Sequence, residues 1–253
     1  MTDVNERDSA LAAELAERAG ALLLDLQRTS GLTGKELGKA GDAQSNELLL
    51  QLLAERRPDD AVLSEESADS PERLSADRVW IIDPLDGTRE YGMPGRPDWA
   101  VHVALWERGA AGSAITAAAV AQPALSMVYA SGRSTTVRGP HSDPVFLVSD
   151  SRPPEFAAPV AAALGANLQP MGSAGAKAMA VLRGDADAYL HAGGQWEWDS
   201  AAPVGVALAA GLHASRVDGS TLTYNAEHPY LPDLLICRVD LAEKILMEIA
   251  AAS

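Results

Sequence analysis

The chain has 253 residues, 47% of them hydrophobic, so it can bury a substantial core as one large domain or two modest ones. Its 35 acidic and 20 basic residues give a net charge of -15, which argues against nucleic acid polymers and anionic membranes as partners. Without a transmembrane-length apolar segment or a signal-like N-terminus, and with one cysteine, Cys237, in an apolar stretch, we expect a cytoplasmic protein with a buried, inert thiol.

The first half of the chain predicts helices packed against a sheet. Apolar residues at helical spacing indicate an amphipathic helix over about residues 9–28. A glycine-rich joint is expected from Gly31 to Gly41, with Asp42 capping a second helix from Ala43 to Arg56. Strand-like runs follow at 61–63, 79–82, 99–106, 114–120 and 125–130. Since turns join neighbouring runs, we expect an antiparallel sheet.

From about residue 141 the pattern changes to strands alternating with helices. The runs predict strands at 145–148 and 188–190, and helices at 154–164, 174–183 and 200–210. Glycines that follow these helices are placed as stops: Gly165, Gly184 and Gly211. We therefore expect an N-terminal α+β half over residues 1–140 and a C-terminal α/β half over residues 141–253.

The run from Asp83 to Thr88 is the main candidate for chemistry. A strand that ends on Asp83 and turns at the next residue, a proline, lets Asp83 and Asp86 converge with the Leu85 carbonyl exposed between them. Hard cations such as Mg²⁺ prefer such oxygen ligands. Gly87 would let a phosphate approach the backbone, and the Thr88 hydroxyl can orient a water.

Three further carboxylate elements support this loop, although each has an ordinary structural alternative. Glu65-Glu66 follows a predicted strand, but an adjacent glutamate pair is more often a solvated turn. Asp42 and Asp199 both precede predicted helices and would be good N-caps. Asp-Pro and Asp-Gly are also common turn dipeptides, so each element alone is weak and only their combination is specific.

In this order the elements resemble the inositol monophosphatase superfamily of magnesium-dependent, lithium-sensitive phosphatases. The resemblance rests on Trp80 to Thr88, on Trp198 to Pro203 continuing to Gly211, on Ser64 to Ser67, and on Gly41 to Ala43. It spans essentially the whole chain. The resemblance implies an α/β fold, a layered αβαβα sandwich of the sugar-phosphatase type.

The resemblance also implies roles for the carboxylates. It places one Mg²⁺ on Glu65, Asp83 and the Leu85 carbonyl, and a second on Asp83, Asp86 and Asp199, with two or three ions in all. Two such ions hydrolyse a phosphate ester in line, without a covalent intermediate. Asp42 and Thr88 would then orient and deprotonate the attacking water, and Glu66 would support the metal ligands.

Two longer tracts, Asp83 to Leu105 and Gln195 to Gly219, look most like the CysQ-type 3'-phosphoadenosine-5'-phosphate phosphatases. Inositol monophosphatases usually carry a glutamate before the second signature, where this chain has His191 to Gly194. The resemblance implies hydrolysis of 3'-phosphoadenosine 5'-phosphate, and also of 3'-phosphoadenylyl sulfate, in sulfate assimilation. The implied substrate contacts are Gly87, Thr88, Arg152, Ser173, Lys177 and Asp199.

Several alternatives stay open at this point. Arg152 and Lys177 are as often solvated surface charges as anion ligands, and Arg152 stands where a histidine is more usual. Trp196 or Tyr224 could stack on adenine. The five histidines lack zinc-like spacing and are interpreted as structural or exposed. Rival functions are the same chemistry on inositol phosphates or fructose 1,6-bisphosphate, and a catalytically silent binding protein. The partner is a small phosphate ester, and the chain is a monomer or a homodimer.

Overall fold

The structure is a computed structural model that describes residues 2–110, 112–133, 139 and 141–252. Within these residues, ten strands form two five-stranded sheets. The first sheet has its strands in chain order: β1 (Ala61–Ser64), β2 (Arg78–Asp86), β3 (Ala100–Gly109), β4 (Gly112–Gln122) and β5 (Met127–Ala130). The helices of this half are α1 (Thr2–Thr29), α2 (Gly34–Arg56) and α3 (Thr88–Tyr91), with 3-10 turns η1 (Pro71–Leu74) and η2 (Pro123–Leu125).

The second sheet has the order β7-β6-β8-β10-β9. Its strands are β6 (Val145–Ser149), β7 (Asn167–Met171), β8 (Ala188–Trp196), β9 (His213–Ser215) and β10 (Tyr230–Cys237). Strand β6 is parallel to β7 and β8, whereas β10 is antiparallel to β8 and β9. The helices are α4 (Ala157–Leu164), α5 (Ala174–Arg183), α6 (Glu197–Ala209) and α7 (Val239–Ala252).

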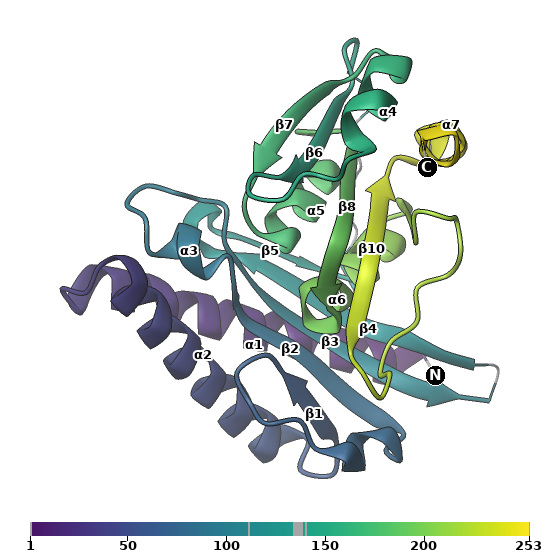
Figure 1. The fold of residues 1–253 in the computed structure, drawn as a ribbon. Coiled ribbons are helices and arrows are strands. Elements are labelled where there is room, and N and C mark those ends of the chain that lie inside the picture. Colours follow the sequence, from purple (N-terminus) through teal and green to yellow (C-terminus); the bar gives the residue numbers. More distant parts are fainter. Residues whose placement is uncertain (1, 111, 134–138, 140, 253) are drawn as a thin grey trace.

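The elements stack in five layers, as predicted (Figure 1). Helices α1 and α2 cover one face of the first sheet and share an apolar cluster with it. Helices α5 and α6 lie between the two sheets and share a second cluster with both. Helices α4 and α7 pack on the other face of the second sheet and enclose a third cluster. The predicted αβαβα sandwich is therefore confirmed.

Strand β3 shows how the sequence produces this layering. Val101, Val103 and Leu105 alternate with residues that point the other way, and belong to the cluster beneath α1 and α2. Ala100 and Ala104 point to the opposite face, toward α6. Both faces are buried, and the small residues on the inner face let α6 approach closely.

The predicted antiparallel sheet is correct for β2 to β5 and wrong for β1. Ala61 of β1 pairs with Val79 of β2 in parallel register. The connection between these strands contains η1 and carries the chain back to the edge where β1 begins. Consequently the ends of β1 and β2 lie at the same edge of the sheet, which brings Glu65 toward Asp83.

The predicted glycine-rich joint before residue 42 is wrong, because α2 already begins at Gly34. The glycines of this helix provide close approach instead of flexibility. A Cβ on Gly38 would lie 2.7 Å from Thr88 Cγ2, and one on Gly41 would lie 2.8 Å from Tyr91 Cε1. Asp42 is therefore an interior residue of α2 and not its N-cap.

Other boundaries also differ from the expectations. Strand β2 does not end at Asp83 but continues to Asp86, with an irregular register between the two. Strands β7, β9 and β10 and helix α7 were not predicted. Prolines inside β7 and β10, Pro170 and Pro232, weaken the sequence pattern of those strands. The boundary expected near residue 140 falls beside residues 134–138 and 140, which lie outside the described residues.

Two smaller expectations concern the thiol and the membrane. Cys237 is fully buried in β10, and burial raises the pKa of its thiol to about 12, as expected of an inert cysteine. In the described part of the chain, none of the helices combines the length and apolar character that crossing a bilayer requires.

Candidate active site

Three aspartates from two elements converge between the sheets. Asp83 and Asp86 lie at the end of β2, and Asp199 lies in the first turn of α6. One carboxylate oxygen from each lies within 4.8 Å of the others. The expectation that Asp199 is the N-cap of this helix is wrong, because α6 begins at Glu197 and Asp199 is its third residue. Its Oδ2 accepts a hydrogen bond of 2.6 Å from the Trp196 amide, which fixes the carboxylate at the helix start.

The environment of Asp83 suits a cation. Its Oδ1 accepts a hydrogen bond from Leu85 N at 3.0 Å, while its buried Oδ2 has no hydrogen-bond partner among the described residues. Burial, and then the charges of Glu65, Asp86 and Asp199, raise the pKa of Asp83 well above its usual range. Burial and the charge of Asp86 likewise raise the pKa of Asp199 to about 6. Carboxylates crowded in this way fit divalent metal ions bound through oxygen.

Asp86 is held by groups from both halves of the molecule. Its Oδ2 accepts hydrogen bonds from Ser173 Oγ at 2.5 Å and Gly175 N at 2.7 Å, and lies 3.2 Å from His102 Nε2. Burial opposes ionisation of Asp86, but His102 and Ser173 outweigh it and hold its pKa at about 2. These contacts all use Oδ2, so none of them occupies Oδ1.

His102 is a site residue that the sequence interpretation missed, since we expected the histidines to be structural or exposed. It is fully buried on the inner face of β3 and pairs in register with Asp83. Its Nδ1 donates to the Trp198 carbonyl at 3.0 Å, and although burial opposes protonation, Asp86 raises its pKa above the ordinary value. The available signal was a polar residue between Ala100 and Ala104 in a buried strand.

Asp42 and Thr88 meet across the contact between α2 and α3. Thr88 Oγ1 lies 3.1 Å from both Asp42 Oδ1 and the Leu85 carbonyl, so its one hydrogen can be donated to either. Burial, and then the charge of Glu66, raise the pKa of Asp42 to about 6. The structure thus brings together the pair that the sequence assigned to water activation.

Glu65 and Glu66 follow β1 and are both exposed. Glu65, Asp86 and Asp199 line one cavity. Partial desolvation and the charges of the two aspartates raise the pKa of Glu65. Glu66 is held through its backbone, where its amide donates to Ser64 Oγ at 3.3 Å. Of the two, Glu65 therefore lines the cavity with the aspartates, whereas Glu66 acts on Asp42 through its charge.

A cavity of about 370 Å³ opens over the carboxylates and is large enough for a small ligand. Arg152 lines it, and within the described residues the Arg152 side chain forms no hydrogen bond or ion pair. This guanidinium is free to bind an anion. The sequence alone could not distinguish this position from ordinary surface charge.

Lys177 lines the same cavity but is already engaged. Its Nζ donates to the carbonyls of Met171, Gly172 and Ser173 at 3.3, 3.2 and 2.7 Å, and lies 4.9 Å from the centre of the Tyr189 ring. Burial lowers its pKa to about 8. An ammonium group has three hydrogens, so Lys177 would have to release a carbonyl before it could bind a phosphate directly.

Gly87 and Ser173 meet where the two halves touch. Gly87 has φ +87°, and a Cβ there would lie 3.0 Å from the Asp98 carbonyl and 3.1 Å from Ser173 Cβ, so only glycine fits this position. Ser173 Oγ donates to Asp86 and accepts from Ala176 N at 2.9 Å. The Ser173 hydroxyl therefore ties Asp86 to α5 as well as lining the cavity.

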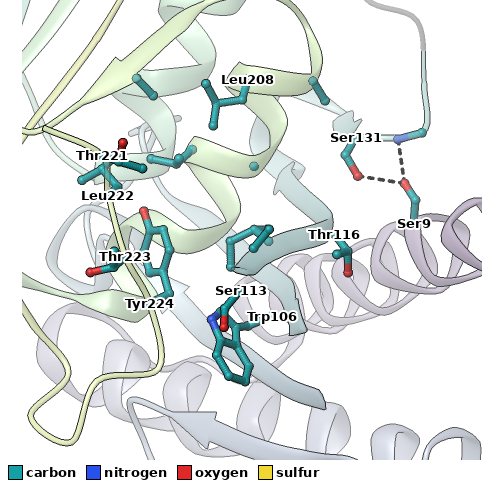
Figure 2. A pocket seen from close by; sticks show the side chains of 17 residues that line it. Ser9, Trp106, Ser113, Thr116, Ser131, Leu208, Thr221, Leu222, Thr223 and Tyr224 are labelled. Carbon is teal, nitrogen blue, oxygen red and sulfur yellow. Dashed lines mark hydrogen bonds between the residues drawn. The ribbon is translucent and has the colours of Figure 1, made fainter. Parts of the chain in front are cut away.

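The two candidates for adenine stacking are separated by the structure. Trp196 lines the cavity over the carboxylates. Tyr224 instead lines a second cavity, of about 920 Å³, between α6, β4 and the loop that carries Thr221 (Figure 2). Its hydroxyl donates to Ser200 Oγ at 3.3 Å. Tyr224 is thus removed from the aspartates, and Trp196 is the candidate that faces them.

Comparison with known proteins adds to this geometry. The sequence profile of the inositol monophosphatase family matches residues 4–251. The 3'-phosphoadenosine 5'-phosphate phosphatase of Mycobacterium leprae is 55% identical over 249 residues, covering 94% of this chain and 92% of the relative. That of Mycobacterium tuberculosis is 56% identical over 240 residues, covering 92% and 90%. The crystal structure of CysQ from Bacteroides thetaiotaomicron, a bacterial member of the family, superposes with a TM-score of 0.78 at 22% identity, covering 92% of this chain and 97% of that one.

Proposed function

The chain belongs to the inositol monophosphatase family, and we propose that it is a Mg²⁺-dependent phosphatase that converts 3'-phosphoadenosine 5'-phosphate to AMP and phosphate. The observation that carries the proposal is the buried cluster of Asp83, Asp86 and Asp199, in a chain whose mycobacterial relatives are named for this reaction. The family is one of metal-dependent phosphatases, so an enzyme is favoured over a catalytically silent binding protein. The phosphate ester is a small molecule.

The carboxylates supply ligands for two Mg²⁺ ions. Glu65, Asp83 and the Leu85 carbonyl would hold one, and Asp83, Asp86 and Asp199 the other. Two observations support this assignment: Asp83 Oδ2 has no hydrogen-bond partner among the residues that the structure describes, and the pKa of Asp83 is raised. When bound, the ions neutralise charge on the phosphoryl group, acidify the attacking water and stabilise the leaving oxygen.

Thr88 and Asp42 would handle the proton of the attacking water. When Thr88 Oγ1 donates to Asp42 Oδ1, its oxygen is oriented to accept a hydrogen bond from water. As the water oxygen attacks phosphorus, the bond from phosphorus to the ribose 3'-oxygen breaks, and the water proton passes through Thr88 to Asp42. The 3'-oxygen keeps the electron pair of the broken bond and takes a proton from solvent water, which gives the 3'-hydroxyl of AMP. Glu66 would assist the proton transfer to Asp42 through its negative charge, which raises the pKa of Asp42.

The second phosphate of the substrate, at the 5'-position, needs a cation away from the carboxylates. Arg152 supports this role, because it lines the cavity and its guanidinium has no partner in the part of the chain that the structure describes. A guanidinium binds phosphate in a bidentate manner, which gives direction as well as charge. Lys177 would contribute mainly through its long-range charge and by shaping the loop that carries Ser173.

The test compares kcat/KM for 3'-phosphoadenosine 5'-phosphate, inositol 1-phosphate and fructose 1,6-bisphosphate on one preparation with Mg²⁺. We expect a preference for the nucleotide of about 100-fold or more, corresponding to roughly 2.7 kcal/mol of transition-state discrimination. Similar kcat/KM values on all three substrates, or a higher value on either sugar phosphate, would be compatible with metal-dependent hydrolysis. Either result would contradict 3'-phosphoadenosine 5'-phosphate as the preferred substrate.

Arg152→Ala sharpens this test. We expect the variant to lose kcat/KM on the bisphosphate by about tenfold or more, since a hydrogen-bonded charge contributes roughly 1.5–3 kcal/mol. Activity on inositol 1-phosphate, which has one phosphate, should change little. Arg133→Ala removes another arginine that is exposed and lies outside the cavity, and serves as the matched control. Equal losses on both substrates would exclude Arg152 as the second anion ligand.

A further inference from the structure

Four aromatic side chains gather at one wall of the cavity over the carboxylates. The rings of Trp196 and Trp198 are stacked, with centroids 5.4 Å apart and 15° between planes. His228 and Tyr230 lie edge-on to Trp196, at 5.4 and 5.8 Å. Two members of the group line the cavity and keep large exposed areas: 38% of Trp196 and 44% of Tyr230. This wall offers bare aromatic surface beside a phosphate site.

A β-bulge turns Trp196 toward this cavity. Between the pairs Ala192↔Asp233 and Gln195↔Leu231, strand β8 has two residues where β10 has one. The extra residue shifts the alternation, so Trp196 lies on the same face as His191, although five positions separate them. Without the bulge, the Trp196 side chain would point to the opposite face of the sheet. Strands β8 and β10 run side by side in Figure 1.

The residues of the bulge are suited to holding it. Gly193 and Gly194 have φ values of +90° and +87°, which favour glycine. A Cβ on Gly194 would lie 2.0 Å from the Tyr230 hydroxyl oxygen, so the tyrosine ring closes against a bare backbone. His191 Nε2 donates to the Gly194 carbonyl at 3.1 Å and fixes the turn. The bulge thereby positions both exposed rings.

We propose that Trp196 and Tyr230, aimed by the bulge at Gly193 and Gly194, form the subsite that binds the purine base of a nucleoside 3',5'-bisphosphate. This inference rests on the proposed function, and it names the part of the site that separates a nucleotide from a sugar phosphate. The wall consists of aromatic rings, so it offers a stacking surface to a base and no carboxylate to sugar hydroxyls. Arg152 lines the same cavity and would hold the 5'-phosphate of the stacked nucleotide.

The test uses two substrates that differ only in the base: 3'-phosphoadenosine 5'-phosphate and ribose 3,5-bisphosphate. Trp196→Ala should lower kcat/KM for the nucleotide by about 5- to 150-fold, the range expected for loss of one base–aromatic stack, mainly through KM. Activity on ribose 3,5-bisphosphate should be unchanged, because the backbone amide that binds Asp199 remains in the variant. Trp196→Phe keeps an aromatic ring and should restore most of the discrimination.

Leu208→Ala is the matched control, because Leu208 is an exposed apolar residue of α6, the helix that follows Trp196, and lines the second cavity (Figure 2). Equal losses on both substrates in Trp196→Ala would mean that Trp196 acts through Asp199, and would overturn the base subsite. Undiminished discrimination in that variant would overturn it as well. If the unmodified protein does not hydrolyse the nucleotide at all, the proposed function fails before the subsite is tested.

Thermal unfolding of each variant provides the check on folding. We expect Trp196→Phe to unfold within a few degrees of the unmodified protein, since a ring is retained in the cluster. AMP binding provides a readout independent of turnover. Trp196 has the largest exposed fraction of the five tryptophans, so AMP with Mg²⁺ should quench fluorescence in the unmodified protein and markedly less in Trp196→Phe. Equal quenching in both proteins would contradict the stack.

Discussion

At Asp42, burial and a neighbouring charge set the chemistry more than the residue type does. An exposed aspartate is ionised at every pH where proteins are usually assayed, whereas burial and Glu66 raise the pKa of Asp42 to about 6. A carboxylate with such a pKa can accept a proton from water at neutral pH and release it again in the next cycle. Thr88, at 3.1 Å, connects it to the centre of the site.

Removing this pair should abolish most turnover without removing the metal site. We expect Asp42→Asn and Thr88→Ala each to lower kcat by about 10²- to 10⁴-fold, the range for loss of general base catalysis. Stabilisation by Mg²⁺ in thermal unfolding should persist, because neither side chain is a proposed ligand. Thr221→Ala, an exposed threonine in the second cavity, is the control. A loss of less than tenfold in both variants would reject the proton relay.

The same carboxylate predicts a pH dependence. Asp42 must be ionised to accept a proton, so kcat should rise with pH through the pKa of Asp42 and level off above it. Bound Mg²⁺ adds positive charge nearby, so this limb should lie no higher than about pH 6. A pH profile of kcat from 4.5 to 8 measures it. The limb should disappear from the residual activity of Asp42→Asn, and its survival there would assign it to another group.

His191 makes the stability of the protein sensitive to acid. Burial lowers its pKa to about 4, against about 6.5 in the unfolded chain. Between these values the unfolded state binds a proton that the native state excludes, so the free energy of unfolding falls as the pH drops from 6.5 toward 4. This single group should cost about 2 kcal/mol at pH 5 relative to pH 7.5.

His191→Gln provides the test, because a glutamine amide can still donate to the Gly194 carbonyl. Urea unfolding at pH 7.5 and pH 5 should show a smaller loss of stability for the variant than for the unmodified protein. The difference between the two losses isolates His191 from the other titrating groups. Identical losses would mean that His191 is protonated in the native state as easily as in the unfolded one.

At the scale of elements, the packing of α2 against α3 decides whether Asp42 reaches Thr88. Gly38 and Gly41 lie on the face of α2 that meets Thr88, Leu85 and Tyr91, and Cβ atoms at either glycine would lie within 3 Å of those side chains. A glycine inside a helix costs about 1 kcal/mol relative to alanine. At these two positions the absence of a Cβ allows α2 and α3 to approach closely, despite that cost.

Gly38→Ala should therefore reduce activity while leaving the fold intact. The added methyl would lie 2.7 Å from Thr88 Cγ2, so Thr88 or the helix has to move. We expect kcat to fall by up to about 100-fold, since a displacement near 1 Å at a catalytic group has that effect. Lys39→Ala, an exposed neighbour, is the control in the same helix. Unchanged kcat in Gly38→Ala would show that α2 adjusts without moving Thr88.

At the scale of the whole molecule, the site is built where the two sheets and their helices meet. Asp86 of the first sheet is bonded to Ser173 and Gly175 at the start of α5, and Asp98 Oδ2 accepts from Gly172 N at 2.9 Å. Both sets of bonds join the half expected over residues 1–140 to the half expected over 141–253, a division that stays a prediction. The protein is strongly acidic, and the buried carboxylates concentrate that charge at the junction.

Mg²⁺ should accordingly stabilise the whole protein. At 100 times its dissociation constant a ligand of the native state adds about 2.7 kcal/mol to the free energy of unfolding. Asp83→Asn removes one of the mutually repelling charges, so we expect the metal-free variant to be more stable than the metal-free parent, with a smaller gain from Mg²⁺ and no turnover. Thermal unfolding with and without MgCl₂, with NaCl at matched ionic strength, measures both. If Mg²⁺ stabilises both proteins equally, Asp83 is not a ligand of the metal.

The sequence by itself predicted the carboxylates of the candidate site and, through its family resemblance, the order of the layers. The carboxylates of Asp83, Asp86 and Asp199 are recognisable because they occupy short local motifs whose residue types suit hard cations. The alternation along β3 predicted a strand because side-chain direction repeats every two residues. Such signals are local, so they can be recognised in a short stretch of sequence without knowing how the rest of the chain folds.

Only the tertiary structure decided which side chains of distant elements come into contact. It made Asp42 an interior residue of a helix facing Thr88, brought His102 to Asp86 and engaged Lys177 with three carbonyls. It also placed Arg152 in the cavity with no side-chain hydrogen bond or ion pair to any described residue. One extra residue in β8 decided the direction of Trp196. The reason is physical: a one-residue shift in register inverts every later side chain, and contacts between distant elements depend on packing that no local window of sequence contains.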